Sequence, residues 1–147
     1  MQRLSSAAFS HPQGGMLIYD DPLTITRRGV EIKIRMDTRK KVLVIDDDVD
    51  FGLALTYFFD DKPYRLFLAH TLSAGMFILE NERPEFVFLD NGLPDGFGWE
   101  KAEYIMMKYP KVQLNLISAL QAPVPLVKVN RVFQKPVSLE DMFSCLV

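Results

Sequence analysis

The sequence predicts an α/β fold built on a doubly wound, five-stranded parallel sheet. Short apolar runs alternate along the chain with segments whose apolar residues recur at helical spacing, and this alternation is typical of a parallel sheet with helices on both faces. Four of the apolar runs end on a polar residue, at Asp46, Asp90, Ser118 and Lys135. Because the carboxyl ends of parallel strands share one edge of the sheet, we expect these four side chains to meet there.

Local signals support the individual elements. Asp48 can cap the helix after the first strand, and Ser138 with Asp141 can form a capping box at the start of the last helix. A loop rich in Gly and Pro covers residues 91–98. In chain order the expected elements are strand 41–45, helix 50–59, strand 64–69, a helix ending near residue 81, strand 84–90, helix 99–109, strand 111–118, strand 130–134 and a short helix after residue 138.

The first 36 residues differ in character from the rest of the chain. We expect residues 1–36 to form an N-terminal extension ahead of a domain that comprises residues 37–147. Residues 1–15 contain Ser, Gln, Gly and Pro, a composition typical of disordered segments. Residues 17–36 alternate loosely in polarity, and Arg28 with the following glycine can turn a hairpin. The extension is therefore either a disordered leader or an accessory β-hairpin.

Composition excludes several classes of protein. The chain of 147 residues is long enough for one domain with a proper core, and none of its apolar stretches approaches the roughly 20 residues of a membrane span. The formal net charge of −2 argues against direct nucleic-acid binding. Cys145 is the single cysteine, which fits a reducing cytoplasm. We therefore expect a cytoplasmic protein that binds neither membranes nor nucleic acid directly.

The polar residues at the strand ends indicate phosphoryl chemistry. Asp46, Asp47 and Asp90 would repel one another unless a cation neutralises them, and Mg²⁺ prefers such oxygen ligands. Lys135 adds a positive charge, and the Ser118 hydroxyl can donate one hydrogen bond to a phosphoryl oxygen. With its charge masked in this way, the Asp90 carboxylate can act as a nucleophile and form an acyl phosphate.

Residues 40–147 resemble a response-regulator receiver domain of two-component signalling, which has a flavodoxin-like (CheY-like) fold. Four motifs carry the resemblance, and together they are highly specific and span about three-quarters of the chain. They are Val44-Ile45-Asp46-Asp47, Phe88-Leu89-Asp90-Asn91-Gly92-Leu93-Pro94-Asp95-Gly96, Ser118-Ala119 and Lys135-Pro136.

The resemblance implies a role for each matching residue. Asp90 would be the phosphoacceptor, taking its phosphoryl group from a histidine on a sensor histidine kinase or a phosphotransfer protein. Ser118 would be the switch hydroxyl and Lys135 the phosphoryl-binding lysine, followed by a cis peptide bond. The implied Mg²⁺ ligands are Asp47, Asp90 and the backbone carbonyl of Gly92, with Asp46 acting mainly through water.

The chain also departs from the family pattern. Ser118 and Lys135 lie closer in sequence than is usual in the family, and two prolines fall in the intervening residues 119–128, so we expect the fourth helix to be short or absent. Val132 occupies a position where the family often has an aromatic residue. Phe133 is adjacent, but strand alternation points it to the other side of the sheet. The phosphorylated state is therefore expected to be read by an unknown downstream protein in a non-standard way.

We expect a stand-alone receiver, because only twelve residues follow Lys135. It would act as a phosphorylation switch or phosphorelay element, and the only reactions it would catalyse are its own phosphorylation and dephosphorylation. The alternative is a degenerate receiver-like module that binds proteins without phosphorylation. A phosphatase of the haloacid-dehalogenase type would place its nucleophile in an Asp-x-Asp motif after the first strand. A flavodoxin would have a phosphate loop rich in hydroxyl groups and Gly there, where this chain has carboxylates.

Overall fold

The computed structural model describes residues 37–119 and 128–147. The chain divides into two units, Met1–Thr38 and Arg39–Val147. The predicted extension at residues 1–36 lies outside the described residues, and so does the predicted shortened fourth-helix region, apart from its two end residues. Within the described ranges, none of the helices is long and apolar enough to cross a membrane.

Five parallel strands form one sheet, as predicted. In space they follow the order β2–β1–β3–β6–β7, which is the strand order of the flavodoxin-like doubly wound fold. The strands are β1 (Lys40–Ile45), β2 (Tyr64–Ala69), β3 (Phe86–Asp90), β6 (Gln113–Ser118) and β7 (Arg131–Gln134).

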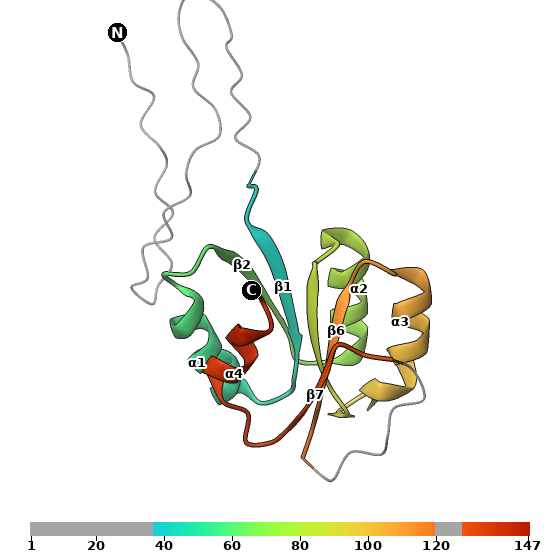
Figure 1. Ribbon diagram of the computed structural model, residues 1–147. Helices are drawn as coiled ribbons and strands as arrows, with labels where there is room; N and C mark the ends of the chain where they lie inside the picture. Colours follow the sequence, from blue (N-terminus) through green and yellow to red (C-terminus); the bar gives the residue numbers. More distant parts are fainter. Residues whose placement is uncertain (1–36, 120–127) are drawn as a thin grey trace, which may run out of the picture. The chain divides into compact units, whose positions relative to one another are not determined.

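Helices cover both faces of this sheet (Figure 1). On one face lie α1 (Val49–Phe59) and α4 (Leu139–Ser144). On the other lie α2 (Leu72–Glu82) and α3 (Ala102–Lys108). The central strands are therefore buried on both sides, which explains why their sequences are continuous apolar runs rather than alternating ones.

The alternation within one strand divides the core into two layers. In β1, Val42 and Val44 face α1 and α4, whereas Leu43 and Ile45 face α2 and α3. All four side chains are almost completely buried. The same division continues through β3 and β6. Because a shift of one residue would turn the side chains of a strand to the opposite faces, the two layers fix the register of the sheet.

Three helices begin with the expected kind of cap. Asp48, Thr71 and Ser138 each accept a hydrogen bond from the backbone N–H three positions later, at 3.0, 3.2 and 3.1 Å. These bonds satisfy N–H groups that have no partner inside the helix. The N-cap predictions for Asp48 and Ser138 are confirmed.

The segment between β3 and α3 differs from the prediction. The loop at residues 91–98 contains a small antiparallel pair, β4 (Gly92–Leu93) and β5 (Gly96–Phe97). The predicted regular helix from Trp99 begins instead as a 3-10 helix, η1 (Gly98–Lys101), and becomes α-helical only at Ala102. The backbone N–H groups of Gly98 and Trp99, which have no partner inside the helix, donate to Asn91, and these bonds attach the start of η1 to the residue after Asp90.

Candidate functional site

The four predicted strand ends meet at one edge of the sheet. Ile45 of β1 lies beside Leu89 of β3, so Asp46 and Asp90 are the next residues of neighbouring strands. Asp90 in turn lies beside Ile117 of β6, the residue before Ser118. The backbone N–H of Lys135 donates to the Ser118 carbonyl at 2.8 Å, which continues the pairing of β7 with β6.

Lys135 joins two buried carboxylates. Its Nζ lies 2.9 Å from Asp46 Oδ2 and 3.1 Å from Asp90 Oδ2. The Asp46 and Asp90 side chains are only 3% and 5% exposed, whereas the Lys135 side chain is 28% exposed. The two carboxylates are therefore held in the protein interior, and the ammonium group closes the pocket from the solvent side.

Asp46, Asp47 and Asp90 form an acidic cluster that fits Mg²⁺. One carboxylate oxygen from each lies within 4.8 Å of the others, and Asp47 is exposed, whereas the other two are buried. Asp46 Oδ2 is buried and accepts no hydrogen bond, although Lys135 Nζ lies close by. This oxygen has room for a further electropositive partner, and all the donor atoms are of the type that hard cations prefer.

The electrostatics of the pocket favour added positive charge. Burial raises the pKa of the Asp90 carboxyl, and it outweighs the hydrogen bond from Lys135, while the charge of Asp46 adds to the increase. Burial works against the Lys135 ammonium group, but its interactions with both carboxylates outweigh this, so its pKa is raised. One ammonium group does not balance three carboxylates, and the pocket keeps an excess of negative charge.

Ser118 and Gly92 also lie at this edge. Ser118 is buried at the end of β6, next to the strand that ends at Asp90. Gly92 opens β4 two residues after Asp90 and is exposed. The roles that the sequence predicts for the Ser118 hydroxyl and for the Gly92 carbonyl as a metal ligand stay predictions.

The loop after β3 is held by residues that sequence reasoning missed. The Asp95 carboxylate accepts hydrogen bonds from the backbone N–H groups of Leu72 and Ser73 at 2.7 and 2.9 Å, and these bonds lower its pKa. It thereby ties the β4–β5 turn to the N-terminus of α2. A Cβ atom on Gly98 would lie 2.0 Å from the Asp90 carbonyl oxygen. The only sequence signal for either role was the richness of this loop in Gly and Pro.

The expected departures are partly visible in β7. Val132 is 38% exposed, while Phe133 is buried and packs on Phe88 of the opposite core layer, with ring centroids 6.0 Å apart. The prediction that these neighbours face opposite sides is confirmed. The Lys135–Pro136 peptide bond is cis, as the resemblance implied.

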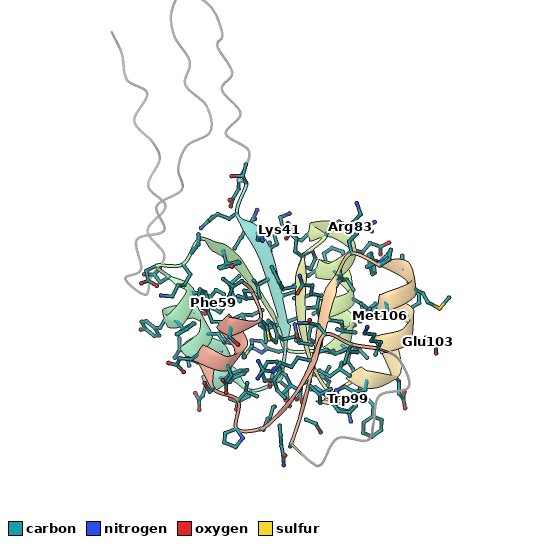
Figure 2. All side chains as sticks on the ribbon, viewed as in Figure 1. Lys41, Phe59, Arg83, Trp99, Glu103 and Met106 are labelled. Atoms are coloured by element: carbon teal, nitrogen blue, oxygen red, sulfur yellow. The ribbon has the colours of Figure 1, made fainter. Side chains whose placement is uncertain are left out.

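Two further residues contact the backbone at the strand ends. His70 is exposed just after β2, and its Nδ1 lies 3.0 Å from the backbone oxygen of Asp46 rather than among the carboxylates. Trp99 is half-buried and packs against the core layer of α2 and α3 (Figure 2). Its indole Nε1 also donates to the Ile117 carbonyl at 3.2 Å, which no sequence pattern indicated.

Comparison with known proteins identifies the same architecture in signalling proteins. No family model matches the sequence. The photosynthetic apparatus regulatory protein RegA of Rhodobacter capsulatus is 26% identical over 113 residues, which are 74% of this chain and 61% of RegA. This chain thus spans about three-fifths of the length of the curated relatives it matches.

Solved structures of receiver domains share the fold. A CheY-like response regulator receiver domain from Methanospirillum hungatei superposes with a TM-score of 0.68 at 22% identity, covering 74% of this chain and 91% of that one. A response regulator protein from Burkholderia pseudomallei, with a phosphorylated aspartic acid, a calcium ion and citrate, has a TM-score of 0.65 at 20% identity. That likeness covers 74% of this chain and 66% of the other.

Proposed function

We propose that this chain is a response-regulator receiver domain of the CheY-like type, and that it accepts a phosphoryl group on Asp90 in a reaction that depends on Mg²⁺. The observation that carries the proposal is the buried Asp46–Lys135–Asp90 arrangement beside the exposed Asp47. Receiver domains are signalling modules, and this site contains a candidate nucleophile, a set of cation ligands and an ammonium group. The similar Burkholderia protein with its phosphorylated aspartic acid supports the proposal.

The Asp90 carboxylate is the attacking group. An Asp90 oxygen forms a bond to phosphorus while the P–N bond of the donor phosphohistidine breaks, and the imidazole nitrogen keeps the electron pair. With acetyl phosphate as donor, a P–O bond breaks instead and acetate leaves. Asp90 is held for this step by the Asn91 N–H on Oδ1 at 2.9 Å and by Lys135 on Oδ2 at 3.1 Å. Fixed geometry and charge neutralisation are the main tasks of a protein in phosphoryl transfer.

Charge neutralisation is shared among several groups. Mg²⁺, when bound by Asp46, Asp47 and Asp90, supplies positive charge to the phosphoryl oxygens. Lys135 can turn from the carboxylates to a phosphoryl oxygen, because its side chain is partly exposed and a lysine ammonium group is carried on a flexible four-carbon chain. Ser118, buried at the neighbouring strand end, donates its hydroxyl hydrogen to another.

The phosphoryl donor is assigned to the side of the site where α1 begins. Val49, Leu53 and Tyr57 are 66%, 55% and 77% exposed and recur at a spacing of four on α1. They form an apolar stripe that runs from beside Asp48, and such a stripe suits packing against a helix of a sensor kinase or phosphotransfer protein. Leu53→Asp is expected to leave labelling by acetyl phosphate unchanged and to reduce labelling by a phosphohistidine protein. If the phosphohistidine protein labelled Leu53→Asp as strongly as it labels the wild type, this assignment would be contradicted.

Intact-mass spectrometry after incubation with acetyl phosphate tests the proposal. The wild-type protein is expected to gain one phosphoryl group with Mg²⁺ and none without it. Asp90→Asn is expected to gain none under either condition, while the matched control Asp60→Asn, an exposed aspartate just after α1, behaves as wild type. Labelling of the Asp90 variant would contradict the site. No labelling of the wild type would favour a receiver-like module that binds proteins without phosphorylation.

The stand-alone role, the cytoplasmic location and the identity of the downstream protein stay predictions. This chain spans only about three-fifths of the length of its curated relatives, so the activities of those whole proteins are not assigned to it. The proposal concerns the described receiver unit alone.

A further inference from the structure

Trp99, the single tryptophan of the chain, lies between the two strand ends that carry Asp90 and Ser118. Its backbone N–H donates to Asn91 Oδ1 at 3.2 Å, and its indole Nε1–H donates to the Ile117 carbonyl at 3.2 Å. Asn91 directly follows Asp90, and Ile117 directly precedes Ser118. One residue of η1 therefore contacts both the residue that follows Asp90 and the residue that precedes Ser118.

Asn91 links the same groups a second time. Its backbone N–H points at two acceptors, Asp90 Oδ1 at 2.9 Å and the Ile117 carbonyl at 3.1 Å. Its own carbonyl accepts from the N–H of Gly98, the first residue of η1, at 2.9 Å. A change in the charge or position of the Asp90 carboxylate therefore acts on Asn91, the residue to which Gly98 and Trp99 of η1 are hydrogen-bonded.

The Ile117 carbonyl senses Ser118 directly. The carbonyl of Ile117 and the N–H of Ser118 belong to one planar peptide unit, so one cannot rotate without the other. If the backbone of Ser118 moves when its hydroxyl engages a phosphoryl group on Asp90, the Ile117 oxygen turns relative to its two donors, Asn91 N–H and Trp99 Nε1–H. The indole then has to follow the carbonyl or lose the bond.

Neighbouring residues in β7 offer no equivalent link. Val132 has no polar side-chain atom and is partly exposed, and Phe133 is packed in the opposite core layer. By contrast, η1 runs without a break into α3, whose outer surface carries the exposed Tyr104 and Met107. The described residues thus provide one continuous path from the strand ends to a surface element.

We propose that Trp99 is the positioning residue that transmits phosphorylation of Asp90 to η1 and α3 through its hydrogen bond to the Ile117 carbonyl. The inference rests on the proposed function of Asp90 as phosphoacceptor. It assigns the readout to the α3 side of the molecule, through an indole that reports on the peptide unit of Ser118.

The indole N–H provides a direct test, because a single tryptophan gives a single ¹⁵N–¹H indole resonance. Spectra are recorded for the full chain alone, with Mg²⁺, and with Mg²⁺ and acetyl phosphate, and intact mass is measured on each sample. The indole resonance is expected to shift further when one phosphoryl group is added than with Mg²⁺ alone. In Asp90→Asn it is expected not to shift on addition of acetyl phosphate.

The mass measurement separates the two possible failures. A phosphorylated protein with an unchanged indole resonance would overturn the role of Trp99 and leave the phosphoacceptor in place. A protein that gains no phosphoryl group would overturn both. In Ser118→Ala, phosphorylation without the indole shift is expected, and an undiminished shift in that variant would contradict the link through the Ser118 peptide unit.

A second comparison uses Trp99→Phe, which keeps an aromatic ring and removes the indole N–H that donates to the Ile117 carbonyl. This variant is expected to take up the phosphoryl group but to lose the phosphorylation-induced amide shifts of Ala102–Lys108, while amides next to Asp90 still shift. The control Phe97→Leu, an exposed aromatic position two residues earlier, keeps the α3 response. Equal α3 shifts in Trp99→Phe and wild type would overturn the proposal.

Discussion

The two edges of the parallel sheet use the same kinds of charged residue in opposite ways. At the carboxyl edge, Lys135 lies between Asp46 and Asp90, and both carboxylates are buried. At the amino edge, which Lys41 and Arg83 mark in Figure 2, the pair Lys108–Glu80 is exposed, and the carboxylate of the part-buried pair Lys41–Glu82 is still 34% exposed. Exposed pairs contribute little to stability, whereas buried charges are costly unless they are well paired. The difference supports the proposal that the phosphoryl chemistry takes place at the carboxyl edge.

Stability at the amino edge comes from aromatic packing. The rings of Phe59, Tyr64 and Phe143 pack edge to face, with centroids 5.7 to 6.3 Å apart, and the Tyr64 hydroxyl donates to the Leu146 carbonyl at 2.8 Å. These contacts hold the C-terminal residues against α1 and the sheet. A pocket lined by Arg83, Tyr109 and neighbouring residues also lies at this edge, remote in the fold from the acidic cluster.

The largest expected effect tests that aromatic packing. Phe59→Ala removes a buried ring and should lower the free energy of unfolding by about 3–5 kcal/mol, because it leaves a cavity. The folded fraction should still accept a phosphoryl group. Urea unfolding with a labelling assay checks both points, and Phe97→Ala, at a 62% exposed position, should change stability by no more than about 0.5 kcal/mol. Loss of labelling in folded Phe59→Ala would remove the distinction between the edges.

Two glycines beside Asp90 give the next largest contrast. In Gly98→Ala the new Cβ would lie 2.0 Å from the Asp90 carbonyl oxygen, so the backbone must move. The free energy of unfolding is expected to fall by about 1–3 kcal/mol, and phosphorylation is expected to be impaired. In Gly92→Ala nothing lies within 4 Å of the new atom, and stability should be nearly unchanged. Thermal unfolding and mass spectrometry of the two variants measure how an added methyl group at each position changes stability and phosphorylation. Equal behaviour of the two variants would contradict the close approach of η1 to Asp90.

Removal of the Asp90 charge should stabilise the metal-free protein. Burial raises the pKa of Asp90, so the folded state holds this proton more tightly than the unfolded state, and stability falls as pH rises through the folded-state pKa. Asp90→Asn lacks this titration and should be the more stable protein above that pH. Urea unfolding of both proteins across the acidic range, with and without Mg²⁺, measures the difference. Mg²⁺ should stabilise the wild type more than the variant, and the reverse order would contradict an acidic metal site.

The smallest effect is expected at the exposed Lys108–Glu80 pair. The two side chains are 39% and 59% exposed, with Nζ and Oε1 3.4 Å apart. Glu80→Gln should change the free energy of unfolding by less than about 1 kcal/mol and leave phosphorylation unaffected. Thermal unfolding at low and high salt checks this expectation. A loss as large as that from a core substitution would show that the amino edge also depends on its charges.

The parts of the fold that sequence reasoning predicted are those set by local pattern. Four apolar runs and one alternating segment at residues 64–69 predicted the five strands, and Asp48 and Ser138 predicted helix starts, because burial and capping act over a few neighbouring residues. Asp46, Asp90, Ser118 and Lys135 were brought to one edge by the general geometry of parallel sheets, and the structure places them there.

The parts that were missed depend on contacts between distant segments. The β4–β5 pair, the 3-10 start at Gly98 and the Asp95 bonds to α2 are produced by hydrogen bonds across the β3–α3 loop. A loop rich in Gly and Pro indicates a turn but not its partners. The Trp99 bond to Ile117 likewise leaves no periodic pattern, since one indole donor contacts one distant carbonyl.

Mapping Mg²⁺ binding by backbone amide shifts tests the difference between the two edges most directly. The account predicts that Mg²⁺ shifts the amides around Asp46–Asp48, Asp90–Gly92, Ser118 and Lys135, and that it leaves Arg83, Lys108 and the other amino-edge residues unchanged. In Asp90→Asn the carboxyl-edge shifts should weaken. Shifts centred on the amino edge, or equal shifts in wild type and variant, would contradict the assignment of chemistry to the carboxyl edge.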